Sequence, residues 1–134
     1  MARTGTTAGF WEVTVTVLIV DDSRVMRTIV RRTLRQAGFD GLEFAEASNG
    51  VEALQAMQSA SPDLVLCDWN MPEMSGLELL EQLKKSGSPV KLGFVTSEST
   101  DSIRGKAMEA GALFLVTKPF TVESLQECLQ PVLG

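Results

Sequence analysis

Five polar side chains in this sequence each follow a short apolar run, and together their types suit the chemistry of phosphate groups. They are Asp21 and Asp22 after the run 17–20, Asp68 after 64–67, Thr96 after 92–95, and Lys118 after 113–117. If these runs are parallel strands of one open sheet, their carboxyl ends lie along the edge where ligands bind in such sheets. We therefore expect the five side chains to meet in one cleft.

Three carboxylates in one cleft repel one another unless a cation joins them. The chain has no histidine and two cysteines, so the expected cation is a hard, oxygen-binding one: Mg²⁺, with Mn²⁺ as the alternative. A carboxylate beside such a cation can attack phosphorus and form an aspartyl phosphate. The ammonium of Lys118 and the hydroxyl of Thr96 suit the other phosphoryl oxygens. A lone Asp after a strand is more often a turn or a helix cap, so the prediction rests on the whole set.

The composition is typical of one globular domain and excludes several classes of protein. The chain has 134 residues, of which 44% are hydrophobic, and its net charge of −5 argues against binding nucleic acid. No segment approaches the roughly 18 apolar residues that cross a membrane, and residues 1–12 lack the apolar stretch of a signal peptide. We therefore expect a cytoplasmic protein with a flexible N-terminal arm at 1–14 and one domain at 15–134.

Apolar runs alternate along the chain with amphipathic segments. The expected strands are 13–20, 43–47, 64–67, 92–95 and 113–117, and the β-branched run 17–20 suits a strand buried on both faces. A helix with an amphipathic pattern follows each strand. Five strands alternating with five helices predict an α/β domain with a parallel sheet and right-handed crossovers.

The first two expected helices show which residues face the core, which face solvent and which cap the helix. In the first helix, apolar or small residues mark one face: Val25, Met26, Ile29, Val30, Thr33, Leu34 and Ala37. Its arginines are expected to form a solvated face: Arg24, Arg27, Arg31, Arg32 and Arg35. Asp22 or Ser23 is expected to cap this helix, and Asn49 with Glu52 has the spacing of a capping box at the start of the second.

Five short motifs resemble the receiver domain of bacterial response regulators. They are VLIVDDS at 17–23, CDWNMP at 67–72, MSGLELL at 74–80, VT at 95–96 and TKPF at 117–120. The resemblance covers about residues 15–133 and is strongest to the chemotaxis type, which is CheY-like. It implies a doubly wound, five-stranded sheet of the flavodoxin/CheY-like order 2-1-3-4-5 with five helices.

The resemblance implies a role for each residue of the expected cleft. Asp68 is the phosphoacceptor, and Lys118 pairs with its phosphoryl group and with Asp68 itself before phosphorylation. The ligands of Mg²⁺ are Asp21, Asp22, a carboxylate oxygen of Asp68 and the backbone carbonyl of Asn70. The bond between Lys118 and the following proline is expected to be cis, a form that proline tolerates.

The resemblance also implies a switch and a control of hydrolysis. Thr96 binds a phosphoryl oxygen and shifts on phosphorylation, while Asn70 and Glu98 tune the hydrolysis of the phosphoryl group. The family usually has Tyr or Phe three residues before the lysine, where this chain has Leu115. Phe114 stands one position earlier, and strand alternation directs it to the opposite face. We therefore expect the phosphorylation chemistry to be retained, although Leu115 occupies the position of the aromatic switch residue.

The expected function is that of a stand-alone receiver. It takes a phosphoryl group from a histidine kinase or phosphotransfer domain onto Asp68 and catalyses only its own phosphorylation and dephosphorylation, so it is not an enzyme of other substrates. Its target is expected to bind the surface of the fourth helix, fifth strand and fifth helix. A phosphorelay shuttle or a receiver fragment of a larger regulator is the alternative.

Three other functions on similar architectures remain open. An aspartyl-phosphate phosphatase usually has Asp-x-Asp after the first strand and a cap insertion, whereas this chain has Asp21-Asp22 and little spare length. A flavin-binding module needs a hydroxyl- and glycine-rich phosphate loop there, and two carboxylates would repel the flavin phosphate. A pseudo-receiver that only binds partners would not need all five polar residues.

Overall fold

A five-stranded parallel sheet forms the centre of the protein in this computed structural model, which describes residues 2–4, 11–13, 15–39 and 41–133. Its strands lie in the order β4-β3-β5-β6-β7, which is 2-1-3-4-5 when these five are counted along the chain. The doubly wound fold and the strand order are as predicted. The strands are β3 (Val15–Val20), β4 (Leu42–Ala47), β5 (Leu64–Cys67), β6 (Lys91–Thr96) and β7 (Leu115–Thr117).

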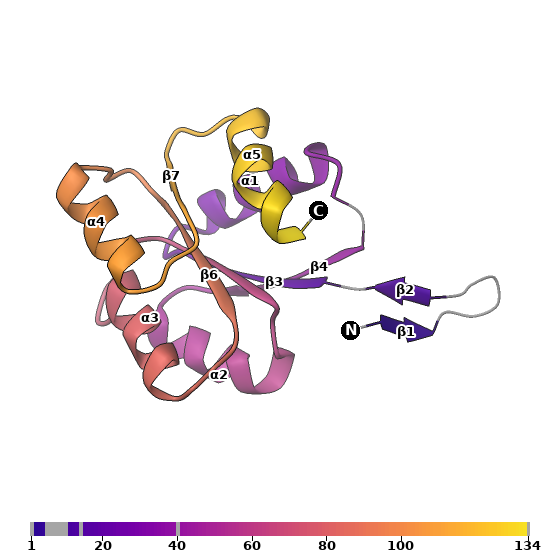
Figure 1. Cartoon of the computed structure of the whole chain (residues 1–134), viewed down its shortest axis with the longest axis horizontal. Coiled ribbons are helices and arrows are strands. Elements are labelled where there is room, and N and C mark those ends of the chain that lie inside the picture. The colour runs from indigo at the N-terminus through magenta and orange to yellow at the C-terminus, as the bar shows by residue number, and fades with distance from the viewer. Residues whose placement is uncertain (1, 5–10, 14, 40, 134) are drawn as a thin grey trace.

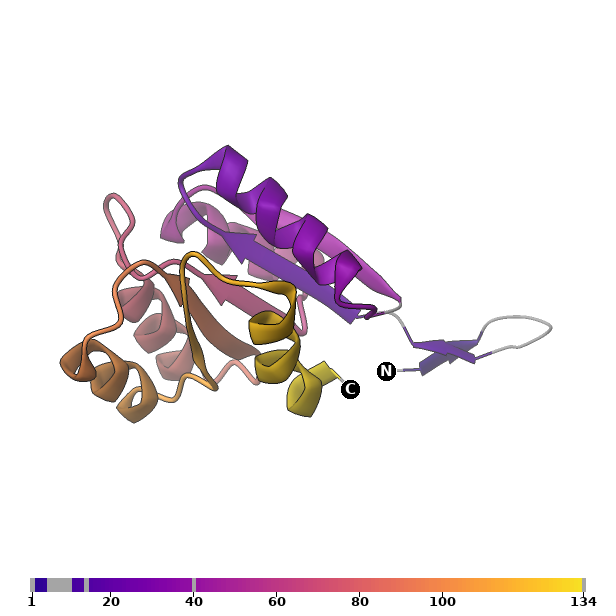
Figure 2. The ribbon, with the colours of Figure 1, turned by 90° about the horizontal axis from the view of Figure 1, so that it is seen from above.

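Helices cover both faces of this sheet (Figures 1 and 2). On one face lie α1 (Arg24–Gln36) and α5 (Val122–Leu133), and on the other lie α2 (Gly50–Ala60), α3 (Gly76–Lys85) and α4 (Asp101–Glu109). Each face has its own core, with Ile19 and Leu34 in the first and Leu18 and Leu80 in the second. Because residues of β3 and β5 are buried on both faces, these strands read as unbroken apolar runs.

Side-chain caps begin the helices close to the ends of the strands. Ser23 Oγ accepts a hydrogen bond from the Met26 backbone N–H, which fixes the start of α1 directly after Asp21 and Asp22. Ser75 and Glu78 form a complete capping box at the start of α3.

At the start of α2 the capping box is half formed. Asn49 Oδ1 accepts a hydrogen bond from the Glu52 backbone N–H at 2.8 Å, as the spacing predicted. The Glu52 carboxylate instead accepts from the backbone and the hydroxyl of Ser48. The hydroxyl gives Glu52 a second donor beside the backbone N–H, which favours this partner.

The first strand begins later than predicted, and part of the segment before it forms a small two-stranded sheet. Val13 belongs to β2 (Trp11–Val13), which pairs antiparallel with β1 (Ala2–Thr4), and β3 begins only at Val15. Figures 1 and 2 show this hairpin extending beyond the amino end of β3. Alternation of apolar and polar residues is typical of a strand in a hairpin as well as of a strand in the central sheet. The pattern alone therefore could not show that Val13 belongs to a separate strand. Residues 1, 5–10 and 14 of the expected arm lie outside the described residues.

Two further predictions placed apolar residues incorrectly. The strand predicted from Leu113 begins at Leu115, and the Leu113 side chain is exposed even though its backbone N–H donates to the Leu92 carbonyl. On α1, Val25 and Ile29 are also exposed, because the sheet covers a narrower stripe than the apolar pattern indicated. No helix in the described residues is long and apolar enough to cross a membrane.

Candidate functional site

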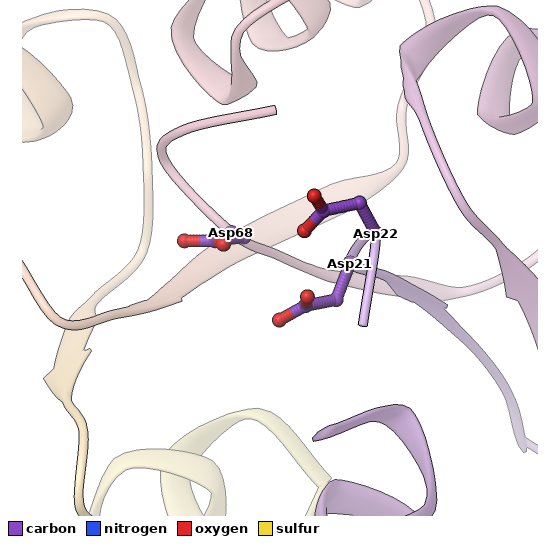
Figure 3. Close-up of side chains that lie close together, drawn as sticks. All are labelled: Asp21, Asp22 and Asp68. Atoms are coloured by element: carbon purple, nitrogen blue, oxygen red, sulfur yellow. The ribbon is translucent and has the colours of Figure 1, made fainter. Parts of the chain in front are cut away.

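Three carboxylates gather at the carboxyl edge of the sheet (Figure 3). Asp21 and Asp22 follow β3 and Asp68 follows β5, and one oxygen from each lies within 4.8 Å of the others. Asp21 is buried, Asp68 is partly buried and Asp22 is exposed, so the group runs from the interior to the surface. The structure thus brings together the three acidic residues that the sequence placed at strand ends.

Lys118 places an ammonium group inside this acidic cluster. It follows β7, its Nζ lies 2.8 Å from Asp21 Oδ2 and 3.5 Å from Asp68 Oδ2, and its side chain is 14% exposed. Its backbone N–H donates to the Thr96 carbonyl at 2.8 Å, which holds it at the sheet edge. The Lys118–Pro119 bond is cis, as expected. The lysine thus reaches both carboxylates, with the shorter contact to Asp21.

Thr96 ends β6 and is fully buried beside this cluster. Its Oγ1 accepts a hydrogen bond from the Glu98 backbone N–H at 3.3 Å, which links the buried hydroxyl to the loop that follows. Asn70 and Glu98 lie on the loops after β5 and β6, and Asn70 Nδ2 donates to the Glu98 carboxylate. This contact joins the two loops that follow Asp68 and Thr96.

The surroundings of Asp68 raise its pKa above the usual value for an aspartate. Burial is the main cause, Asp21 acts in the same direction, and Lys118 opposes both. Hydrogen bonds from the Thr96 hydroxyl and the Trp69 backbone also favour the ionised form. Since the balance disfavours the bare carboxylate, a cation bound beside it would be stabilising here.

Gly76 positions the Asp68 loop, and no other residue fits at this position without rearrangement. Its backbone N–H donates to the Trp69 carbonyl at 2.9 Å, and a Cβ there would lie 2.3 Å from the Asp68 carbonyl oxygen. The Trp69 ring packs edge-on against Phe94, with 5.1 Å between ring centroids. Close contact of α3 with the backbone after β5 therefore fixes where the Asp68 side chain begins.

Leu115, the first residue of β7, and Phe114, which precedes it, point to opposite faces of the sheet, as strand alternation predicted. Leu115 is buried in the core under α2, α3 and α4, and Phe114 is buried in the core under α1 and α5. Phe114 occupies the space above Gly93, where a Cβ would lie 2.2 Å from its ring. Arg104 of α4 donates to the Leu115 carbonyl at 3.3 Å. The chain therefore has an aliphatic side chain at this position, tied to α4 through its backbone.

Sequence reasoning missed the importance of Arg27 and misplaced part of the arginine face of α1. Arg27 is 14% exposed and Arg31 is 32% exposed, and both contact the Glu46 carboxylate of β4. Arg27 also donates to the Asp21 carbonyl at 2.6 Å. The solvated-face prediction is wrong for these two residues because an acidic residue on the neighbouring strand draws them inward. Glu46, near the end of the predicted strand 43–47, was the one feature of the sequence that could have indicated an acidic partner for these arginines.

The donor set fits a hard divalent cation. All three side chains offer carboxylate oxygens, and the described residues place no thiolate or imidazole in the cluster. A Mg²⁺ ion binds oxygen ligands at about 2.1 Å, so opposed ligands lie about 4.2 Å apart, which is on the scale of the cluster. Among the residues that the structure describes, one ammonium, that of Lys118, pairs with this group of three carboxylates, so a further positive charge at this site would be stabilising.

Comparison with known proteins gives one consistent result. The response regulator receiver domain family matches residues 17–130. The chain is 36% identical to chemotaxis protein CheY1 of Helicobacter pylori, over 88% of this chain and 96% of that protein. It is 38% identical to the CheY homolog of Campylobacter jejuni, over 88% and 92%. Among solved structures it is similar to chemotaxis protein CheY4 of Vibrio cholerae, with 33% identity, a TM-score of 0.79 and coverage of 90% and 100%.

Proposed function

Because the chain belongs to the response regulator receiver domain family and is CheY-like, we propose that it is a chemotaxis-type receiver phosphorylated on Asp68. One observation carries the proposal: Asp21, Asp22 and Asp68 converge at the sheet edge with Lys118 between two of them. This arrangement supports Asp68 as the acceptor, because its carboxylate is only partly buried and lies 3.5 Å from Lys118, whereas Asp21 is buried and paired with Lys118 at 2.8 Å.

Phosphoryl transfer at this site needs positioning and charge neutralisation more than covalent help from the protein. A carboxylate oxygen of Asp68 attacks the phosphorus of a phosphohistidine, the phosphorus–nitrogen bond breaks, and the bonding electrons stay with the imidazole of the donor. Asp21, Asp22, Asp68 and the Asn70 carbonyl would hold Mg²⁺, which would neutralise negative charge on the phosphoryl oxygens when bound. Lys118 already lies 3.5 Å from Asp68 Oδ2, which suits it to pair with the new phosphoryl group.

The proposed output is a shift between two states of the region around Thr96 and Leu115. The buried Thr96 hydroxyl turns toward a phosphoryl oxygen, and Leu115 on the neighbouring strand β7 changes its packing under α4. A target that binds the α4–β7–α5 surface more tightly in one state is then coupled to phosphorylation through that population shift. Leu115 has no ring or hydroxyl, so the readout depends on its shape and on the Arg104 contact to its carbonyl.

We propose a histidine kinase or phosphotransfer domain as the donor, a cytoplasmic location, and no catalysis beyond the domain's own phosphorylation and dephosphorylation. Asn70 and Glu98 are the proposed hydrolysis-tuning pair, since their contact lies between the loops after Asp68 and Thr96. The relatives described as chemotaxis proteins favour this role over a phosphorelay shuttle. The shuttle remains the second candidate because the same acceptor chemistry serves both.

The test is intact mass spectrometry after incubation with Mg²⁺ and acetyl phosphate. We expect one added phosphoryl group, lost with EDTA and in Asp68→Asn. Asp101→Asn, which removes an exposed carboxylate on α4, is the matched control and keeps the adduct. Labelling of Asp68→Asn at the wild-type rate would mean that the acceptor is another residue. If the wild type shows no adduct, a beryllofluoride titration separates fast hydrolysis, in which the analogue binds, from a domain that does not bind a phosphoryl group.

A further inference from the structure

We propose that Arg27 of α1 is a positioning residue for the metal-binding pair Asp21–Asp22 and acts through the Asp21 carbonyl. The inference rests on the proposed function, because it concerns how the Mg²⁺ ligands of that site are held. Arg27 does not reach the acidic cluster with its side chain; it holds the backbone from which two of the three carboxylates extend.

The Arg27 guanidinium joins α1 to the ends of two strands. Its Nη1 donates to the Asp21 carbonyl at 2.6 Å, and its Nε donates to Glu46 Oε1 at 2.8 Å. Glu46 is held in turn by Arg31, one turn further along α1. Because a guanidinium is rigid and planar, two acceptors on different groups fix both its place and its orientation. With 14% of its side chain exposed, Arg27 makes these contacts largely shielded from water.

The carbonyl that Arg27 holds belongs to the peptide linking Asp21 to Asp22. Fixing that peptide plane restricts the direction in which the Asp22 side chain leaves the backbone. Asp21 is restrained in other ways as well: its backbone N–H donates to Ala47, its Oδ1 accepts from the Ser23 N–H, and its Oδ2 accepts from Lys118.

The Asp22 carboxylate, by contrast, is exposed and has no hydrogen-bond partner within the described residues. Its position therefore depends mainly on the backbone. Within the described residues, the Arg27 hydrogen bond is the one contact that a charged side chain makes with the peptide group between Asp21 and Asp22, since Lys118 contacts the Asp21 side chain. Loss of this bond would leave Asp22 free to sample directions that point away from the cluster. The expected effect is weaker Mg²⁺ binding, since partners that orient metal ligands typically contribute about 10–100-fold in affinity.

Arg31 provides a matched control, because it carries the same charge on the same helix and contacts the same Glu46 without reaching Asp21. The experiment measures the Mg²⁺ dissociation constant from Trp69 emission, in a Trp11→Phe background that leaves one tryptophan, beside the thermal midpoint of each variant. We expect Arg27→Met to raise the dissociation constant about 10-fold or more. Arg31→Met is expected to stay within about twofold, as surface ion pairs contribute little.

Two further readouts separate positioning from general stability. Arg27→Lys keeps the charge but replaces the planar guanidinium, which donates from two nitrogens, with a single ammonium nitrogen. We therefore expect its Mg²⁺ affinity to lie between those of wild type and Arg27→Met. At saturating Mg²⁺ the maximal rate of phosphoryl uptake by Arg27→Met is expected to return to near the wild-type rate, because the variant alters the affinity for the cation and leaves the acceptor intact. If Arg27→Met does not fold, the Arg27→Lys measurement decides.

The inference is overturned if a folded Arg27 variant binds Mg²⁺ within about twofold of wild type, the range expected for a surface pair. It is also overturned if Arg31→Met weakens binding as much as Arg27→Met, since the contact with the Asp21 carbonyl would then be immaterial. If the wild type itself neither binds Mg²⁺ nor gains a phosphoryl group, the proposed function fails and this inference fails with it. If the wild type does both, only the role of Arg27 is in question.

Discussion

The two flanks of the acidic cluster are held by different kinds of contact. The metal flank comprises the end of β3, α1, β4 and the Lys118 side chain, where charged groups make short hydrogen bonds to Asp21 and Glu46. The switch flank comprises β6, Phe114, β7 and α4. There the buried Leu115 and Phe114 pack into apolar cores, and one arginine contacts a backbone carbonyl.

This difference indicates which part of the site is fixed and which part can change. Charge-assisted hydrogen bonds with two defined acceptors specify one geometry, which suits the proposed metal site. An aliphatic side chain has several staggered conformations, and a change among them need not break a hydrogen bond. We therefore expect changes on the metal flank to alter cation binding and changes on the switch flank to alter stability or output alone.

The largest expected effect is on the metal flank. Asp21→Asn removes a ligand charge and the closer partner of Lys118. We expect Mg²⁺ affinity to fall by more than about 100-fold, because indirect partners of metal ligands already contribute about 10–100-fold. A Mg²⁺ titration against phosphoryl uptake checks this. Glu43→Gln removes an exposed negative charge on β4 and is the control. Equal losses in the two variants would point to net charge as the cause.

On the switch flank, Gly93→Ala should destabilise the protein and leave cation binding unchanged. A Cβ at Gly93 would lie 2.2 Å from the Phe114 ring, so the ring has to move. Overpacking of this kind costs about 1–3 kcal/mol of unfolding free energy, measurable by urea denaturation. Adding Phe114→Leu should recover part of the loss, since a smaller side chain leaves room for the methyl group. A change in Mg²⁺ affinity with Gly93→Ala would show that the flanks are coupled more tightly than their contacts suggest.

Proton binding at Asp68 should make the Mg²⁺ affinity of the acidic cluster depend on pH. Burial raises the pKa of Asp68, so the carboxyl keeps its proton to a higher pH than usual. Below that pKa, Mg²⁺ must displace the proton, and affinity should fall about tenfold per unit of pH from this group. Above it, affinity should level off. In Asp68→Asn this component of the pH dependence should disappear; if it persists, another carboxyl is responsible.

The same pKa shift has a consequence for the stability of the metal-free protein. Because the folded-state pKa of Asp68 is raised, its contribution to stability is fully present below the unfolded-state pKa and is lost as pH rises through the folded-state pKa. Without Mg²⁺, Asp68→Asn should therefore have a larger free energy of unfolding than wild type at neutral pH. Adding Mg²⁺ should reduce this difference between the two proteins. Urea denaturation of both proteins with and without Mg²⁺ is the measurement.

The smallest expected effect comes from Arg104→Met on the switch flank. This change removes the hydrogen bond to the Leu115 carbonyl, and such a contact contributes about 0.5–1.5 kcal/mol. Mg²⁺ affinity and phosphoryl uptake should be unaffected, while binding of a target to the α4–β7–α5 surface should change. Lys106→Met, on the same helix, controls for loss of an exposed cation. An effect of Arg104→Met on phosphoryl uptake would contradict the separation of the two flanks.

The sequence predicted much of the fold because its signals are local. Strand 64–67 coincides with β5, and the strand order follows from the resemblance. The errors fall where a local pattern suits two structures: the alternation at Val13 belongs to a hairpin, and the apolar residues Val25 and Ile29 lie on an exposed part of α1. Which part of an amphipathic helix is covered depends on its neighbours, and the helix's own sequence does not state it.

By itself the sequence determined which residues lie at the candidate site, because residues that end parallel strands share one edge of the sheet. Asp21, Asp22 and Asp68 are therefore together for a topological reason. Only the tertiary structure decided how they are held: Lys118 lies closer to Asp21 than to Asp68, and Arg27 turns inward to the Asp21 carbonyl and Glu46. Lys118 and Asp21 are 97 positions apart in the chain, and no periodicity or spacing encodes which side chains meet across such a distance.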